Sequence, residues 1–283
     1  MISSKLFGVA MIAYFISTLL YIFFLSLRKD KLSFLASIVT WIGFLFQTAG
    51  LVLRWKDSYA MGTEYGRIPL TNLFESMVFF SWVVVLVYLG VEIKFKYKSF
   101  GAFVIPFSLI ALAYTAFLSD EIEPLVPALQ SYWLHFHVAT CFLGYASFAV
   151  ACGISIVYLL KERAEKKGNN PGSFLSVFPN IKILDEINYK VIAIGFPLLT
   201  IGIITGAYWA NYAWGTYWSW DPKETWSLIT WFVYAAFLHA RYTYGWMGRR
   251  TAILSIAGFI MVIFCYLGVN LLLSGLHSYA ATT

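Results

Sequence analysis

Eight long apolar stretches, joined by short charged connections, constrain this chain more than any other feature. They cover Leu6–Leu27, Leu32–Leu53, Leu73–Ile93, Phe100–Leu118, Trp133–Leu160, Val191–Tyr208, Trp226–Tyr244 and Ala252–Ser274. A helix needs about 20 such residues to cross the hydrocarbon core of a membrane. Lipid offers the backbone no hydrogen-bond partner, and the alternating pattern of a membrane barrel is missing. The sequence therefore predicts an all-α polytopic membrane protein with about eight transmembrane helices.

Composition agrees with this class. The chain has 283 residues, of which 60% are hydrophobic and only 12% are charged, whereas soluble domains keep about a quarter of their residues charged. We find no internal repeat and no separate soluble segment, so we expect residues 1–283 to form a single transmembrane domain. The three cysteines, Cys141, Cys152 and Cys265, all lie in apolar stretches without a C-x-x-C pattern, which favours buried thiols over a disulfide or a thiolate metal site.

Basic residues predict how the chain is oriented. The connections after the first, third, fifth and seventh stretches carry 15 of the 20 Lys and Arg residues. Because positive connections stay on the cytoplasmic side, both termini are expected on the outer, periplasmic or lumenal side. The net charge of +6 is explained by this clustering, and no nucleic-acid partner is expected.

The segment "WGTYWSWDPKET" at 214–225 falls on the expected outer face and is unusually rich in flat rings. Asp221, Pro222 and Glu224 have the spacing of a capping box that begins a helix, which accounts for both carboxylates. A belt of interfacial aromatics explains one or two tryptophans but not the whole group. That group is Trp209, Trp214, Trp218, Trp220 and Trp226, with Tyr208, Tyr212 and Tyr217 between them. Gly215 would let the backbone approach a flat partner, so the pattern favours a platform for a large planar ligand.

The chain has four histidines, three of them near the outer face. His135 and His137 begin the fifth stretch, and because they are about 200° apart around a helix they do not face one small ligand. His277 follows the eighth stretch. His239 lies about 20 Å along the seventh helix from Trp226, where a hydrogen bond to a neighbouring helix is the plainer interpretation and a functional site the alternative.

Imidazoles flanking an aromatic bed are typical of a haem site, because haem is planar and its iron takes axial histidines. Zinc fits less well, since it needs converging ligands and neither H-x-x-x-H nor H-E-x-x-H occurs.

These residues resemble a known family. "WGTYWSWDPKETWSLITW" is similar to the tryptophan-rich "WWD" signature of the haem-handling proteins of cytochrome c biogenesis, specifically the CcsA (ResC) branch of system II. Further similar segments are "PLTNLFESMVFFSW" at 69–82, "LDEINYKVIAIGFPLLTIGIITGAYWANYAWG" at 184–215, "FLHARY" at 237–242 and "GVNLLLSGLHSY" at 268–279.

The resemblance implies the roles of particular residues. "WLHFHVATCFLGYASF" aligns best with His137 as the first axial ligand and "GLHSY" with His277 as the second, although His135 is an extra histidine beside the first. His239 corresponds to a ligand of an inner haem site that the partner protein completes. Residues 209–225 are the external haem-binding segment. Its expected contacts are Trp214, Gly215, Trp218, Trp220 and Asp221, and Lys223, Arg54, Lys56 and Arg67 are possible counter-ions for haem carboxylates.

The implied function is transport and presentation of haem b, followed by its covalent attachment to apocytochrome c. This is holocytochrome c synthase (haem lyase) activity, and the chain is the CcsA part of a complex with CcsB (ResB). His137 and His277 then hold the haem beside the two thiols of a C-x-x-C-H motif. Thiol-reducing proteins are further expected partners, and the location is a bacterial plasma (inner) or thylakoid membrane.

Three other functions fit part of the sequence. A haem exporter or chaperone would use the same ligands without the attachment chemistry. A quinone-linked cytochrome b needs paired intramembrane histidines, whereas only His239 lies at depth. A small-molecule transporter would show matched helix breaks, which the glycines and prolines do not mark.

Overall fold

The computed structural model describes residues 1–168, 174–273 and 275, and every regular element in those ranges is helical. The long helices are α1 (Ile2–Leu27), α2 (Asp30–Ala60), α3 (Leu73–Phe95), α4 (Gly101–Tyr114), α5 (Tyr132–Lys166), α6 (Ile181–Trp214), α7 (Pro222–Tyr244) and α8 (Arg249–Ile263). The shorter elements are η1 (Lys98–Phe100), η2 (Thr115–Phe117), η3 (Pro127–Leu129), η4 (Phe174–Val177), the π-helical turn η5 (Phe264–Gly268) and α9 (Val269–Leu272). The predicted all-α class is confirmed.

Seven helical segments of the described chain are long and apolar enough to cross a membrane, which confirms a multi-pass membrane protein. They correspond to seven of the eight predicted stretches. The remaining stretch, Trp226–Tyr244, lies in α7. This helix has 23 residues and a length of about 34 Å at 1.5 Å per residue. It is not among the seven because it carries more polar side chains, including Lys223, Glu224 and Arg241.

The described residues group into two compact units. Unit 1 consists of Met1–Leu125 and Leu160–Asn180, and unit 2 of Val126–Leu159 and the chain from Ile181 onward. The helix α5 contributes to both. That residues 1–283 act as a single functional domain stays a prediction.

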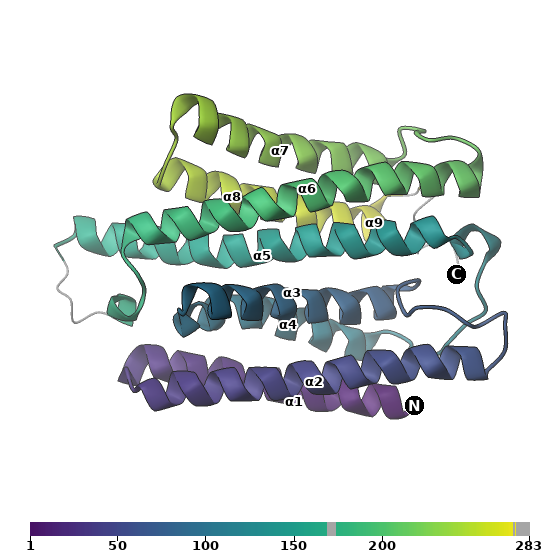
Figure 1. Cartoon of the computed structure of the whole chain (residues 1–283), viewed down its shortest axis with the longest axis horizontal. Coiled ribbons are helices and arrows are strands. Elements are labelled where there is room, and N and C mark those ends of the chain that lie inside the picture. The colour runs from purple at the N-terminus through teal and green to yellow at the C-terminus, as the bar shows by residue number, and fades with distance from the viewer. Residues whose placement is uncertain (169–173, 274, 276–283) are drawn as a thin grey trace. The chain divides into compact units, whose positions relative to one another are not determined.

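Unit 1 contains two helical hairpins, α1 with α2 and α3 with α4, and α1 also packs on α4 (Figure 1). Its interior is mainly apolar but contains hydrogen bonds between helices, which contribute to helix association in membrane proteins. The Tyr14 hydroxyl donates to Gln47 over 2.6 Å, and the Gln47 amide donates to the Val78 carbonyl over 3.0 Å. Large apolar side chains such as Phe23 and Leu45 are exposed instead, as contact with lipid requires.

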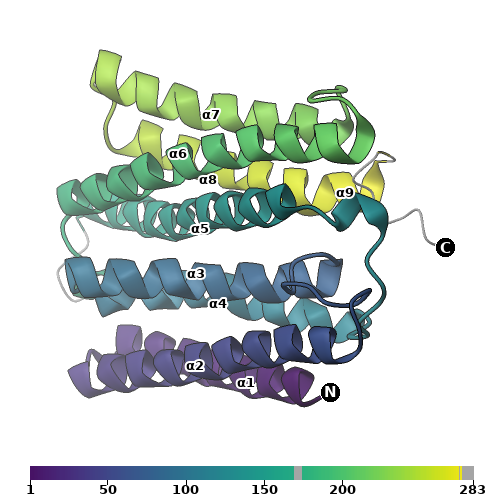
Figure 2. The same ribbon diagram turned by 45° about the vertical axis from the view of Figure 1, so that its right-hand side comes forward.

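Unit 2 contains most of α5, with α6, α7 and α8, and α7 packs on both α6 and α8 (Figure 2). Small residues bring α5 and α6 close together, since a Cβ on Gly195 would lie 2.7 Å from the Ser147 Cβ. Phe148 of α5 stacks on Tyr234 of α7 with ring centroids 3.5 Å apart. At one end of α7 the Arg241 guanidinium pairs with buried Asp185, which also accepts from the Gly248 amide. These contacts hold α5, α6 and α7 together within unit 2, and the ion pair lies at the end of α7 opposite to the tryptophan-rich segment.

Candidate functional site

The carboxylates of the tryptophan-rich segment hold its own backbone. Asp221 is the N-cap of α7 and accepts a hydrogen bond from the Lys223 amide over 3.0 Å. In return the Glu224 side chain accepts from the amides of Asp221, at 3.2 Å, and Ser219, at 2.7 Å. This capping box was predicted from the sequence and is confirmed. It fixes the turn that carries the tryptophans to the start of α7.

Two residues of this segment lie in the left-handed region. Gly215 has φ +76° and follows the last residue of α6, where glycine has no Cβ penalty. Trp220 has φ +61°, a conformation that costs a residue with a side chain roughly 1–2 kcal/mol. The residue is nevertheless 69% exposed. Such strain is often retained at functional sites, so Trp220 is a functional candidate on geometry as well as on sequence.

His137 is fixed by α6. Its Nδ1 lies 2.7 Å from the carbonyl oxygen of Gly202. Because a carbonyl only accepts, Nδ1 carries the proton, and in the neutral ring the lone pair lies on Nε2. Metal-binding histidines commonly have their second nitrogen held in this way by a carbonyl, which fixes the tautomer and raises ligand basicity.

The ring of His137 packs beside the indole of Trp209, which in turn contacts the indole of Trp214. It lies nearly parallel to Trp209, at a centroid distance of 5.8 Å and an angle of 20°. Trp209 is 5% exposed, donates from Nε1 to the Ala128 carbonyl, and meets Trp214 edge-on at 4.9 Å. The structure therefore brings together His137, Trp209 and Trp214.

Other predicted residues lie differently. Trp218 and Trp220 form a separate perpendicular pair with centroids 5.7 Å apart. His135 is half-buried on α5. His277, the expected second ligand, lies outside the described residues.

His239 lies on the exposed side of α7, with Nδ1 3.4 Å from the Thr243 hydroxyl and its ring edge-on to Tyr244. Exposed positions of α7 recur at intervals of three and four residues: Ile229, Phe232, Ala236, His239 and Thr243. They form one face of the helix, so His239 is directed away from the interior of unit 2.

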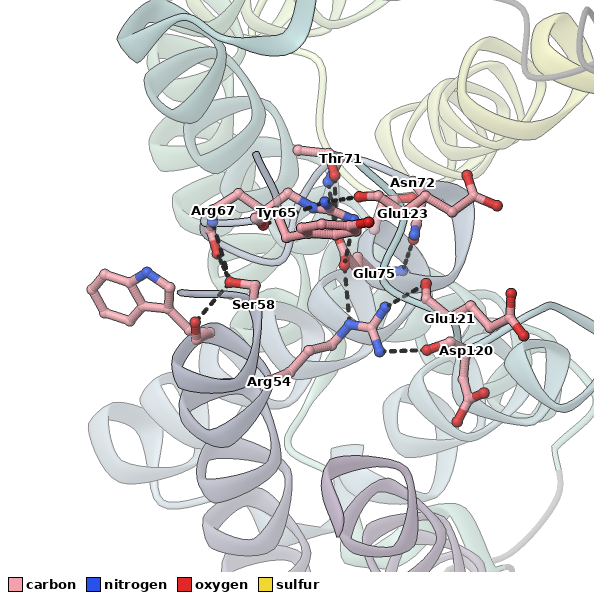
Figure 3. A network of polar contacts seen from close by, with 12 residues as sticks. Arg54, Ser58, Tyr65, Arg67, Thr71, Asn72, Glu75, Asp120, Glu121 and Glu123 are labelled. Carbon is pink, nitrogen blue, oxygen red and sulfur yellow. Dashed lines mark hydrogen bonds and ion pairs between the residues drawn. The ribbon is translucent and has the colours of Figure 1, made fainter. Parts of the chain in front are cut away.

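The candidate counter-ions separate into different groups. Lys223 donates from Nζ to the Asn270 side chain over 2.9 Å, and Lys56 is exposed. Arg54 and Arg67 are buried in unit 1 beside Glu75, at 3.0 and 3.5 Å (Figure 3).

The two arginines also hold the loop at residues 120–123 of unit 1. Arg54 donates to the carbonyls of Asp120 and Glu121, and Arg67 to that of Glu123. The carboxylates of this loop point away from the guanidinium groups (Figure 3). Arg54 and Arg67, expected from the sequence as possible counter-ions for haem carboxylates, are instead buried and paired with Glu75 in unit 1.

Sequence reasoning missed Gly202, Gly206 and the position of Trp209 beside His137. A Cβ on Gly206 would lie 2.5 Å from His137 Nδ1. The available signal was the spacing of glycines along α6, at 195, 202 and 206, which is typical of close helix contact in membranes.

Comparison with known proteins agrees with the sequence resemblance. A family model described as "Cytochrome C assembly protein" matches residues 70–277. The "Cytochrome c biogenesis protein CcsA" of Chlamydomonas reinhardtii is 45% identical over 236 residues, which are 81% of this chain and 64% of that protein. The protein of the same name from Synechococcus sp. (strain CC9902) is 40% identical over 280 residues, or 90% of each chain.

The fold is also found in a solved structure. "Cytochrome c Heme Lyase CcmF" superposes with a TM-score of 0.68 over 93% of this chain and 46% of its own length, at 17% sequence identity.

Proposed function

The chain belongs to the cytochrome c assembly protein family and, within it, to the CcsA proteins, and we propose that it holds haem for covalent attachment to apocytochrome c. The single observation that carries the proposal is the state of His137. Its Nδ1 donates to the Gly202 carbonyl, which leaves Nε2 as the nitrogen that can bind iron. The second axial ligand in this proposal is His277.

The indoles next to His137 supply the remainder of the site. Haem is flat and apolar across its faces. The flat ring of Trp209 lies beside the proposed ligand, and that of Trp214 packs edge-on against Trp209. Trp218 and Trp220 add a second pair of indoles on the loop before α7. Gly215 and Asp221 shape this loop rather than contact iron, because the first ends α6 and the second caps α7.

The residues position the reaction. Each cysteine of a C-x-x-C-H motif adds across one haem vinyl group: the sulfur–hydrogen bond breaks, a carbon–sulfur bond forms, and the hydrogen passes to the other vinyl carbon. No oxidant or reductant is consumed in this addition. Fixing the vinyl edge beside the thiols makes a bimolecular step effectively unimolecular. The high effective molarity of the thiols then raises the reaction rate. The histidine of the motif then replaces His137 or His277 at the iron.

We propose that His239 belongs to an inner haem site completed by a partner of the CcsB (ResB) type. Its exposed position on α7 is what such a shared site requires, because an iron held by both proteins must lie at their contact. We also propose that the attachment site lies on the outer face of a plasma or thylakoid membrane. Lyase activity in this proposal depends on the complex with the partner.

A haem exporter or chaperone remains the second candidate, and one experiment separates the two. The purified chain with its partner is mixed with reduced haem b and an apocytochrome, and the covalent product is detected by haem stain after denaturation. We expect covalent product with C-x-x-C-H and none with A-x-x-A-H. Binding of haem without any covalent product, under reducing conditions, would favour the carrier function.

The strained tryptophan gives a further prediction. Trp220→Gly removes an exposed side chain and relieves the left-handed backbone, so we expect the free energy of unfolding to stay level or rise by up to about 1 kcal/mol. Cytochrome c maturation should fall at the same time. Unfolding titrations and haem-stained cytochrome c measure the two effects. Trp55→Ala, an exposed tryptophan on ordinary helix backbone, is the control, and equal maturation in both variants would remove Trp220 from the site.

A further inference from the structure

We infer that Gly206 is a positioning residue for His137, because only a residue without a side chain lets the imidazole reach the Gly202 carbonyl. The inference rests on the proposed function and assigns to α6 the task of directing the ligand carried by α5. Its basis is the contact between one ring and one helical turn, Gly202 to Gly206.

The clash that a side chain would cause falls on the hydrogen-bonding atom itself. A Cβ at Gly206 would lie 2.5 Å from His137 Nδ1, 2.7 Å from Cε1 and 3.4 Å from Cγ. The same Nδ1 is 2.7 Å from the Gly202 oxygen. A movement that clears the methyl group must therefore take Nδ1 away from its acceptor.

The ring is bounded on its other sides as well. Trp209 lies against one face and is itself held by the Ala128 carbonyl. The Cys141 sulfur is 3.7 Å from Nδ1, one helical turn further along α5. Since most side chains in a helix have only two accessible χ1 rotamers, a displaced His137 has few alternative positions.

The hydrogen bond can be lost without unfolding the protein. The Thr205 hydroxyl also donates to the Gly202 oxygen, at 3.1 Å, so that carbonyl keeps a side-chain donor when His137 leaves. Alanine is also a better helix former than glycine. Gly206→Ala should thus displace His137 without lowering the stability of the protein. A substitution at a purely structural glycine would lower stability instead.

Losing the hydrogen bond changes the ligand in two ways. The proton is no longer held on Nδ1, so the lone pair is not always on Nε2. The orientation of the ring is also no longer fixed. Removal of such outer partners of metal ligands typically costs about 10- to 100-fold in affinity or activity. We expect a loss of this size in haem b binding to Gly206→Ala.

The experiment compares four variants of the full chain, purified with its partner and titrated with reduced haem b while absorption spectra are recorded. Gly206→Ala should bind about 10- to 100-fold more weakly and give an altered spectrum, with an unchanged thermal unfolding midpoint. Gly195→Ala is the matched control, because its Cβ meets Ser147 on the same α5–α6 contact at 2.7 Å. It should leave the spectrum unchanged.

His137→Ala, alone and combined with Gly206→Ala, completes the design, with free imidazole added to both. We expect imidazole to restore haem binding equally in the two, since removing the ring removes the clash. This pair also decides the outcome if Gly206→Ala alone does not accumulate: accumulation of the double variant supports the inference, and failure of both overturns it.

The possible failures are distinguishable. A normal spectrum and affinity in Gly206→Ala, together with a spectrum of reduced intensity in His137→Ala, overturns the positioning role and leaves the proposed function intact. An equal loss in Gly195→Ala also overturns it, because the effect is then general packing. Normal haem binding in His137→Ala overturns the proposed function itself.

Discussion

His137→Ala is expected to reduce cytochrome c maturation at least about a hundredfold, because loss of merely an outer partner of a metal ligand costs about 10- to 100-fold. The substitution removes the nitrogen that the Gly202 carbonyl prepares for iron. It leaves Trp209 in place, since that indole is held by the Ala128 carbonyl. Covalent haem in the cytochromes of cells that carry only the variant measures the effect.

His135→Ala is the matched control for this substitution. It lies two residues away on the same helix, is half-buried, and projects about 200° from His137 around the axis. Maturation near the wild-type level is expected for it. Should His135→Ala lose maturation while His137→Ala keeps it, the first axial ligand is the other histidine.

Glu75→Gln is expected to lower the free energy of unfolding by about 3–5 kcal/mol, the cost of breaking a buried ion pair by removing one partner. Glu75 is 2% exposed and carries the only carboxylate that the described ion pairs give to Arg54 and Arg67. Thr71 donates to it as well, through its amide and hydroxyl. Without the charge, two buried guanidinium groups face a neutral amide whose own donors oppose them.

The effect is measured by unfolding the purified chain with SDS in mixed micelles. Glu121→Gln is the control, because that residue is exposed and contacts Arg54 through its backbone carbonyl, which the substitution leaves intact. A change of less than about 0.5 kcal/mol is expected for it, as for surface substitutions generally. Equal stability of the two variants would mean that Glu75 is not the counter-ion of the pair.

Local signals in the sequence predicted much of the fold. Length and hydropathy located all eight helices, and the spacing of Asp221, Pro222 and Glu224 predicted the capping box that the structure contains. Helix ends were less predictable. The helix α6 begins at Ile181 rather than Val191, because the helix continues outside the apolar stretch, where hydropathy gives no signal.

Contacts between helices explain the remaining differences. The meeting of Gly206 with His137 depends on how α5 and α6 are aligned, and that alignment is not encoded in either segment alone. In the same way, the sequence shows Glu75 only as a polar residue at the start of a helix. Its arginine partners lie 21 and 8 residues earlier in the chain, so the pairing could not be predicted from the local sequence. The sequence therefore identified the ligand candidates, and the structure supplied what orients them.

The central claim is that His137 ligates the haem iron, and the absorption spectrum of the purified chain with its partner tests it most directly. We predict a spectrum typical of iron with two histidine ligands for the wild type, a reduced intensity of that spectrum in His137→Ala, where only the inner site proposed at His239 still holds haem, and its return when imidazole is added. A wild-type spectrum in His137→Ala without imidazole would contradict the claim.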